Sequence, residues 1–340
     1  MVDVVVVGAG IIGLTCAVRL QQQGLRVGVV SAHAPDRTVS AVAAAVWYPT
    51  RTDGTPQVLD WARHTFEVFA EQARQPCPGV SMRPTRMLLR APVDQPPWWA
   101  SAVADLRYCQ VSPSPSPSPS LGTEADDGGA GAGGGGGGAV VAEWRCTVPA
   151  VEMGPYLAWL AQRFRSAGGV LQVRRLAALA EAAEVAPVVV NATGLAAATL
   201  AGDPAVHPVR GQVVLVANPG IATSVRDEQH PDGPTYVHPR RRDVVLGGTF
   251  EPGAVSEQPD PATSRAIRAR CAALVPELAG AAVLGQQVGL RPARHGGARV
   301  EAEPAPPAGV RRLVHCYGHG GAGVTLSWGC ADEVVRLVTG

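Results

Sequence analysis

The sequence has few of the features that mark membrane or nucleic-acid-binding proteins. Its 29 Lys and Arg residues balance 28 Asp and Glu residues, for a formal net charge of +1, and no long run carries one sign. This balance gives no reason to expect a nucleic acid or an anionic membrane surface as a partner. No segment reaches about 18 uninterrupted apolar residues, so we expect no transmembrane helix. Residues 1–20 are apolar but lack a basic start, and we interpret them as part of the fold rather than as a signal peptide.

The seven cysteines are scattered and include no Cys-x-x-Cys pair. Neither a disulfide framework nor a zinc site is therefore expected, and a reducing cytoplasm is the predicted location. Residues 337–340 do not form a peroxisomal tripeptide. With 340 residues, 46% of them hydrophobic, the chain is long enough for a globular protein of two domains.

The N-terminal segment carries a nucleotide-binding pattern. Residues 4–7 are four valines, which suits a strand buried on both faces, and a helix to about residue 22 and a strand over 27–30 follow. Between the first strand and the helix lies Gly8-Ala9-Gly10-Ile11-Ile12-Gly13. The first glycine allows the tight turn, the second allows close approach to a pyrophosphate, and the third allows the helix to pack on the strand. Because the helix start also offers free N–H groups to an anion, this β-α-β unit is predicted to bind a dinucleotide.

The glycine turn alone does not distinguish NAD from FAD. An acidic residue at the end of the second strand would normally contact the ribose, but this sequence has Ser31-Ala32-His33 there. Ser31, His33 and backbone groups remain as candidates for that contact. A valine strand over residues 188–190 runs into Asn191-Ala192-Thr193-Gly194. This segment resembles the strand–Ala-Thr-Gly element of flavoproteins with a glutathione-reductase-like domain, and the two elements together favour FAD.

Other periodic segments predict the remaining elements. Helices are expected over residues 58–73, 156–164, 263–274 and 324–337, and strands over 87–90, 170–173, 212–216, 244–246 and 313–316. Residues 112–138 consist of Ser-Pro repeats and a glycine tract. Such a composition cannot bury enough apolar area to offset its ordering entropy, so we expect a disordered surface insertion.

Several segments resemble one family, the D-amino-acid and D-aspartate oxidases. They occur in the family's order and span nearly the whole chain outside residues 112–138. The longest is Tyr317-Gly318-His319-Gly320-Gly321-Ala322-Gly323-Val324-Thr325, followed by Trp328-Gly329-Cys330-Ala331. The others are Val288-Gly289-Leu290-Arg291-Pro292-Ala293-Arg294, Pro208-Val209-Arg210-Gly211-Gln212, Tyr236-Val237-His238-Pro239, Leu246-Gly247-Gly248-Thr249 and Ala43-Ala44-Ala45-Val46-Trp47-Tyr48-Pro49.

The resemblance implies an α/β fold. A Rossmann-like FAD-binding domain of the glutathione-reductase type would carry an inserted antiparallel-sheet α+β substrate domain. We expect residues 1–60, 140–205 and 285–340 to form the FAD-binding domain, and residues 61–111 and 206–284 to form the substrate-binding domain.

The resemblance also assigns roles at the substrate. Arg291 would hold the substrate carboxylate, for which a planar guanidinium is suited because it can donate two charge-assisted hydrogen bonds. Tyr236 would donate its phenolic O–H to the same carboxylate, and the Gly321 carbonyl would accept from the substrate amine. The predicted cofactor contacts are Gly8, Ala9, Gly10, Ile11, Ile12, Gly13, Ser31, Ala44, Ala45, Val46, Thr193, Gly194, Arg291, Gly320, Gly321, Ala322, Gly323, Val324 and Thr325.

The chain departs from the family pattern at two places near this site. Residues 229–235 contain no tyrosine, where family members often have a second one, so we expect a more open substrate entrance. Ala322 stands where many members have an aromatic residue, which is expected to enlarge the room near the flavin. No metal site is expected at His238, His315 and His319, because no carboxylate or cysteine cluster completes one.

The implied reaction is FAD-dependent oxidative deamination of D-amino acids to 2-oxo acids, with release of ammonia and hydrogen peroxide. Hydride would pass from the α-carbon to flavin N5 with no side-chain acid or base. The partners would be a D-amino acid and molecular oxygen, and a homodimer is compatible with the sequence. Alternatives are a D-aspartate oxidase with Arg226 or one of Arg240, Arg241 and Arg242 as second cation, an oxidase of glycine or N-methyl amino acids, an NAD-dependent dehydrogenase, and a non-catalytic flavin-binding protein.

Overall fold

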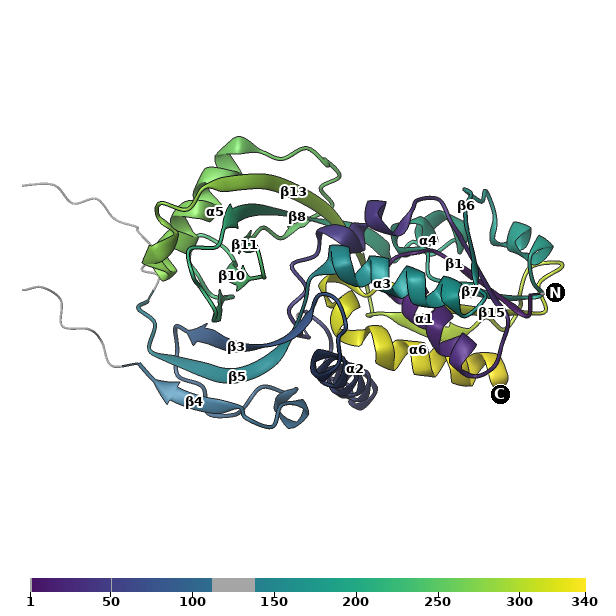
Figure 1. Cartoon of the computed structure of the whole chain (residues 1–340), viewed down its shortest axis with the longest axis horizontal. Coiled ribbons are helices and arrows are strands. Elements are labelled where there is room, and N and C mark those ends of the chain that lie inside the picture. The colour runs from purple at the N-terminus through teal and green to yellow at the C-terminus, as the bar shows by residue number, and fades with distance from the viewer. Residues whose placement is uncertain (1, 50, 112–137) are drawn as a thin grey trace, which may run out of the picture.

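The computed structural model describes residues 2–49, 51–111 and 138–340. The predicted insertion at residues 112–138 therefore lies outside the described residues, except for Gly138. Within the described residues, the strands form two sheets that build two lobes, and both chain termini lie in the lobe of the first sheet (Figure 1). No helix in these ranges is long and apolar enough to cross a bilayer.

The first sheet is parallel apart from one edge strand. Its order is β14 (Arg299–Ala302), β15 (Arg312–Tyr317), β7 (Val188–Asn191), β1 (Val4–Val7), β2 (Val27–Ser31) and β6 (Val170–Val173), with β14 antiparallel to β15. Val4 and Val6 of β1 pack in the cluster that includes the helices, whereas Val5 and Val7 pack with Leu179 on the opposite face. The predicted valine strand is therefore confirmed, and its lack of polar alternation follows from burial on both faces.

Three helices cover the face of the first sheet on which Val4 and Val6 lie. They are α1 (Ile11–Gln22), α3 (Met153–Ser166) and α6 (Gly323–Thr339), and α1 packs on both of the others. A short helix, α4 (Ala197–Leu200), follows β7, and α2 (Pro56–Arg74) packs on α6 and on the edge of the second lobe. Figure 1 shows α1 and α6 side by side below the sheet.

The second sheet is mostly antiparallel. Its order is β12 (Glu251–Pro252), β8 (Val206–Ala217), β11 (Asp243–Gly247), β10 (Thr235–Pro239), β9 (Ser224–Asp227), β3 (Val80–Leu89), β5 (Ala142–Val151) and β4 (Arg107–Gln110). The pair β3–β9 is parallel, and β13 (Val283–Arg294) pairs with the other edge of β8. Helix α5 (Pro261–Leu274) is capped by Asp260, whose side chain accepts hydrogen bonds from N–H groups of the first turn, and it buries Ile267 and Cys271 against this sheet.

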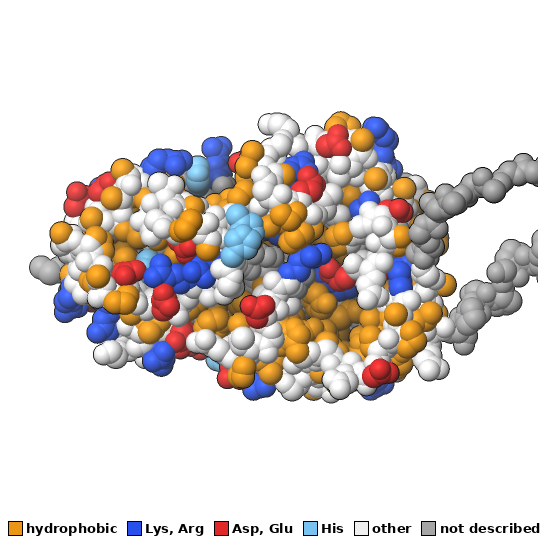
Figure 2. Space-filling model, turned by 180° about the vertical axis from the view of Figure 1, so that it is seen from behind, with side chains coloured by type: hydrophobic (Ala, Val, Ile, Leu, Met, Phe, Trp, Pro, Cys, Tyr) orange, Lys and Arg blue, Asp and Glu red, His pale blue; other side chains and the backbone are white. Residues whose placement is uncertain are grey.

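The predicted fold class is confirmed, since a Rossmann-like parallel sheet with flanking helices stands beside an antiparallel sheet with its own helix. Two long strands, β5 and β13, had no counterpart in the prediction. Both pair within the second sheet, so the segments 140–205 and 285–340, predicted for the FAD-binding domain, each contribute a strand to it. The division into domains otherwise stays a prediction. Figure 2 shows one face of the molecule, on which basic and acidic side chains are interspersed.

Candidate functional site

A cavity of about 1030 Å³ lies where the two sheets meet. It opens at the carboxyl ends of β1, β2, β7 and β15, which is where ligands bind in open parallel sheets. Its volume is at the upper end of the range for small-molecule sites, so it has room for a dinucleotide and a small substrate. Most of the predicted site residues line it: Gly8, Ala9, Gly10, Ile11, Ile12, Ser31, Ala44, Ala45, Val46, Thr193, Gly194, Tyr236, Arg291, Gly320, Gly321, Gly323, Val324 and Thr325.

The glycine turn is fixed by contacts between backbones. A Cβ on Gly8 would lie 2.3 Å from the Ala192 carbonyl oxygen, and one on Gly13 would lie 2.0 Å from the Gly8 carbonyl oxygen. Gly8 also has a φ of +118°, which L side chains rarely adopt. Gly13 does not line the cavity, so its role in the structure is the close packing of α1 on the turn. This bare backbone at a helix start fits the pyrophosphate of a dinucleotide.

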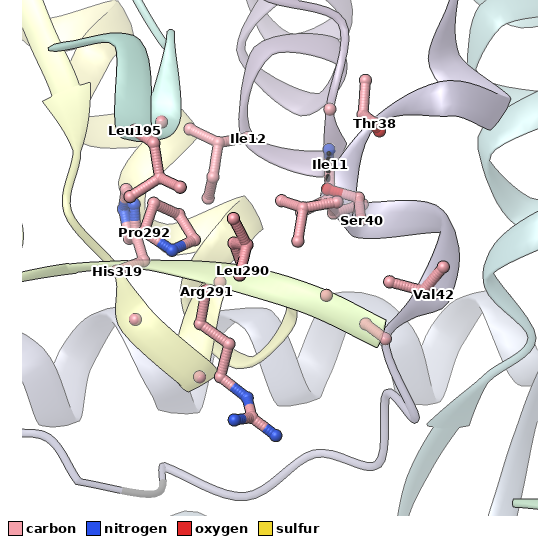
Figure 3. A pocket seen from close by; sticks show the side chains of 18 of the residues that line it. Ile11, Ile12, Thr38, Ser40, Val42, Leu195, Leu290, Arg291, Pro292 and His319 are labelled. Atoms are coloured by element: carbon pink, nitrogen blue, oxygen red, sulfur yellow. Dashed lines mark hydrogen bonds between the residues drawn. The ribbon is translucent and has the colours of Figure 1, made fainter. Parts of the chain in front are cut away.

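A polar residue that the sequence did not reveal caps this helix. The Ile11 N–H donates to Ser40 Oγ at 3.0 Å (Figure 3), and Ser40 lies in the 3-10 turn Val39–Val42. Ser40 Oγ is also 3.0 Å from the place of a Cβ on Gly10. The turn therefore packs closely against Gly10 and lines the cavity beside the predicted pyrophosphate site. Ser40 is far from the motif in sequence, and no local pattern marks it.

Where the cavity meets the end of β2, the residues are Ser31, Ala32 and His33, and none of them is acidic. Ser31 is buried there, and its Oγ accepts a hydrogen bond from the His33 N–H at 3.4 Å. Ser31, His33 and Arg37 all line the cavity, together with Arg174 and Arg175 after β6. Both candidates for the ribose contact that the sequence suggested are therefore on the cavity wall.

A chain of hydrogen bonds holds the Ala192-Thr193-Gly194 turn from behind. Asn191 Oδ1 accepts from the Thr193 N–H at 3.2 Å and from its hydroxyl at 2.7 Å. The Asn191 amide therefore donates to His315 Nδ1 at 3.1 Å, which leaves His315 Nε2–H to donate to Glu303 at 3.1 Å. Burial, and then Arg299, lower the pKa of His315, so it stays neutral in this chain. The buried chain orders a turn that contacts the cavity.

The loop from Ala45 to Tyr48 is fastened to the start of α6. Thr325 Oγ1 donates to the Tyr48 carbonyl at 3.0 Å and accepts from the Tyr48 N–H at 3.1 Å. Ala45 has a φ of 52°, a strained value for a residue with a Cβ, and it faces the cavity. Ala322, predicted as a cofactor contact, is fully buried and is not on the cavity wall.

Arg291 extends from β13 into the cavity, on the side of the strand opposite to Leu290 and Pro292 (Figure 3). Its Nη1 donates to the carbonyl oxygens of Arg210 at 3.3 Å and of Thr249 at 3.1 Å. Among the described residues no carboxylate pairs with it. A half-buried guanidinium held by two neutral acceptors keeps most of its donors available for an anion.

Tyr236 of β10 lies beside this guanidinium. Its ring occupies the space left by two glycines, because a Cβ on Gly247 would be 2.0 Å from its ring and one on Gly248 would be 2.9 Å away. Burial raises the pKa of Tyr236, while the charges of Arg291 and Arg226 oppose the shift. The phenol therefore stays protonated at neutral pH and can donate a hydrogen bond into the cavity.

Arg226 of β9, which the sequence raised only as a candidate, lies opposite Tyr236 in the sheet. Its guanidinium lies over the Tyr48 ring at 3.7 Å, and its Nη2 donates to Glu228 at 2.6 Å. Its Nε is buried and, among the described residues, has no partner. Arg226, Glu228 and Tyr48 all line the cavity.

Two of the three histidines in question for a metal site have close hydrogen-bond partners among the described residues. His315 belongs to the chain described above, and His238 bonds to Ser224 and stacks on Tyr236 at 4.7 Å. Burial, and then Arg226, lower the pKa of His238 well below its usual value. Burial lowers the pKa of His319 to about 4.

The chain matches known proteins over nearly its whole length. A sequence model of the family "FAD dependent oxidoreductase" matches residues 3–337. A D-amino-acid oxidase from Rubrobacter xylanophilus is 47% identical over 98% of this chain and 94% of its own. Human D-aspartate oxidase is 34% identical over 99% of this chain and 94% of its own. Among solved structures, a glycine oxidase from Geobacillus kaustophilus superimposes with a TM-score of 0.77 at 19% identity, covering 99% of this chain and 94% of that one, which supports the fold.

Proposed function

The chain belongs to the family of FAD-dependent oxidoreductases that includes the D-amino-acid oxidases, and we propose that it oxidises D-amino acids at the cavity between its two sheets. One observation carries the proposal. Arg291 and Tyr236, a cation with no carboxylate partner among the described residues and a protonated phenol, line the same cavity as the glycine turns of the FAD-binding lobe.

The residues of the chain hold the substrate in one orientation. The Arg291 guanidinium binds the α-carboxylate, and the Tyr236 hydroxyl donates a further hydrogen bond to it. The Gly321 carbonyl accepts from the amine. FAD, when bound, supplies the acceptor for the hydride that leaves the α-carbon. Because the α-hydrogen leaves as hydride and not as a proton, orientation supplies the rate and no side-chain acid or base is required.

The balanced reaction consumes a D-amino acid, water and oxygen. It releases a 2-oxo acid, ammonia and hydrogen peroxide, because the imino acid formed by loss of hydride and a proton is hydrolysed by water. The names of the chain's relatives support the D configuration. A cytoplasmic location, supported by seven free cysteines, and a homodimer also remain proposals, the second to be tested by light scattering of the purified protein.

The first experiment uses the FAD-loaded protein without oxygen. D-Alanine is expected to bleach the oxidised flavin band and L-alanine is expected to leave it unchanged. Bleaching by neither enantiomer of any amino acid tried would contradict the proposal and leave a flavin-binding protein of another function.

The carboxylate role is tested by Arg291→Lys. Lysine keeps the charge but cannot reproduce two parallel hydrogen bonds, so kcat/KM for D-alanine is expected to fall by about 10- to 100-fold. Arg265→Lys, on the exposed face of α5, is the matched control and should keep the kcat/KM of the unmodified protein. An Arg291→Lys protein with unchanged kcat/KM would remove Arg291 from the site.

A second candidate is oxidation of D-aspartate. Arg226 favours it, since this second cation on the cavity wall has a buried Nε with no partner among the described residues. Initial rates with D-aspartate and D-alanine distinguish the two candidates.

A further inference from the structure

The substrate end of the cavity contains an ion pair in addition to the carboxylate-binding Arg291. Arg226 of β9 and Glu228, two residues further along, both line the cavity, and Arg226 Nη2 donates to Glu228 Oε1 at 2.6 Å. The Arg226 side chain is 9% exposed and that of Glu228 is 31% exposed. The pair is therefore part of the wall that a substrate side chain meets.

The geometry leaves Arg226 little freedom to turn to a ligand. One face of its guanidinium is covered by the Tyr48 ring at 3.7 Å, and one of its terminal nitrogens is already bound to Glu228. Burial, and then the charge of Arg226, lower the pKa of the neighbouring His238, so this imidazole adds no second positive charge. The charge of Arg226 is thus balanced within the protein before any substrate enters.

Whereas Arg226 would attract an anionic ligand, Glu228 would repel it. Its partly exposed carboxylate would lie close to any substrate carboxylate that approached the free edge of Arg226, and two carboxylates at close range repel. Arg51 is a further cation on this wall, but it is exposed and lies over the Phe250 ring at 3.8 Å. Tyr48, Val213 and Phe250 add apolar surface to the cavity.

We propose that Glu228 determines substrate specificity: by holding Arg226, it excludes D-amino acids whose side chains carry a carboxylate and leaves the cavity to neutral ones. The inference rests on the proposed function, because it names the substrate class of the same site. It assigns the charge of Arg226 to a pair within the protein rather than to the binding of D-aspartate.

The test compares two substrates of nearly the same shape, D-asparagine and D-aspartate, with D-alanine as reference. Glu228→Gln keeps the size of the side chain and an acceptor for Arg226 but removes the negative charge. Asp232→Asn is the matched control, since this exposed carboxylate lies in the same loop between β9 and β10 and does not line the cavity. All proteins are assayed with FAD bound, and their flavin spectra report the integrity of the site.

In the unmodified protein, kcat/KM for D-asparagine is expected to exceed that for D-aspartate by about tenfold or more. Glu228→Gln should raise the ratio of D-aspartate to D-asparagine by about tenfold or more, and Asp232→Asn should change it by less than about twofold. A Glu228→Gln protein with the unmodified ratio would overturn the proposal, as would an unmodified protein that oxidises D-aspartate as well as D-asparagine. Failure of all three substrates, D-alanine included, would instead overturn the proposed function itself.

Discussion

Alanine in place of Gly211 would put a methyl group where the Arg291 guanidinium now lies. A Cβ built on Gly211 is 2.3 Å from both Nη1 and Nη2 of Arg291, whereas ordinary contact begins at 3.4 Å. The guanidinium must therefore retreat by about 1 Å. Because it is the end of a flexible side chain, it can do so without movement of the backbone of β8 or β13. The substitution thus displaces the predicted carboxylate anchor and leaves the fold intact.

The expected cost falls on substrate binding and turnover. A misplacement of about 1 Å in a positioning group costs on the order of 100-fold in rate. We expect Gly211→Ala to lower kcat/KM for D-alanine by about 10- to 100-fold, with the FAD content and melting temperature of the unmodified protein. The assay is the rate of flavin reduction against D-alanine concentration in the absence of oxygen.

A glycine of the neighbouring strand β13 provides the control. Gly285 pairs with β8, as the segment around Arg291 does, but no atom lies within 4 Å of a Cβ placed on it. Gly285→Ala should therefore leave flavin reduction unchanged. If Gly211→Ala carried a full complement of FAD and reduced it as fast as the unmodified protein, the placement of Arg291 against Gly211 would be wrong.

Two further predictions concern stability. Gly13→Ala should abolish folded, FAD-containing protein, because its Cβ would lie 2.0 Å from the Gly8 carbonyl oxygen and no rotamer relieves a clash with backbone. The control, Gly154→Ala, lies at an open and exposed position of α3 and should raise the free energy of unfolding by about 0.5–1 kcal/mol, as measured by thermal unfolding. Burial lowers the pKa of His319 from its usual 6.5 to about 4, so the unfolded chain takes up this proton first and stability is lost as the pH falls from about 6.5 to about 4. At about 1.4 kcal/mol per pH unit this contribution is about 3 kcal/mol, so urea unfolding over this pH range should show a loss smaller by about that amount in His319→Gln than in the unmodified protein.

The dinucleotide-binding unit could be predicted because its signals are local. Four valines in β1, the spacing of three glycines and the start of α1 all lie within residues 4–22, and each follows from one short-range constraint. The two faces of the valine strand pack on different layers, which is what the absence of polar alternation indicated.

Strand β13 could not be predicted in the same way. Its sequence includes Gly285, Gly289 and Pro292, which lower the β propensity of the segment. It forms because eleven residues of β8 pair with it along one edge, and Pro292 is tolerated where no further strand needs its missing N–H. The position of Arg291 on a strand therefore depends on pairing between segments far apart in the chain.

The charged strand β9 shows the same limit at the site itself. Residues 224–227 contain Arg226 and Asp227, and both are buried. Neither an apolar pattern nor a turn signal predicts such a strand. Asp227 can be buried because Arg90, which directly follows β3, donates a hydrogen bond to it at 2.7 Å. This partner is 137 residues away in the sequence. The pairing of Arg226 with Glu228 at the cavity becomes visible only when β9 is placed between β10 and β3.

The hydrogen-bond acceptors of each arginine near this cavity indicate whether that arginine has a structural or a ligand-binding role. Arg210 pairs with Glu251 at 2.9 Å and Arg294 pairs with Asp203 at 2.8 Å, where burial opposes ionisation of Asp203 but hydrogen bonds from Arg294 and Tyr317 lower its pKa to about 2. These charges are satisfied before a ligand arrives, and removal of Glu251 or Arg294 would leave its buried partner, Arg210 or Asp203, uncompensated. Arg291 differs because its acceptors are two neutral carbonyls. A half-buried cation without a counter-ion carries a desolvation cost, and a bound anion lowers that cost. The arrangement that leaves Arg291 without a carboxylate partner in the free protein therefore favours binding of an amino-acid carboxylate.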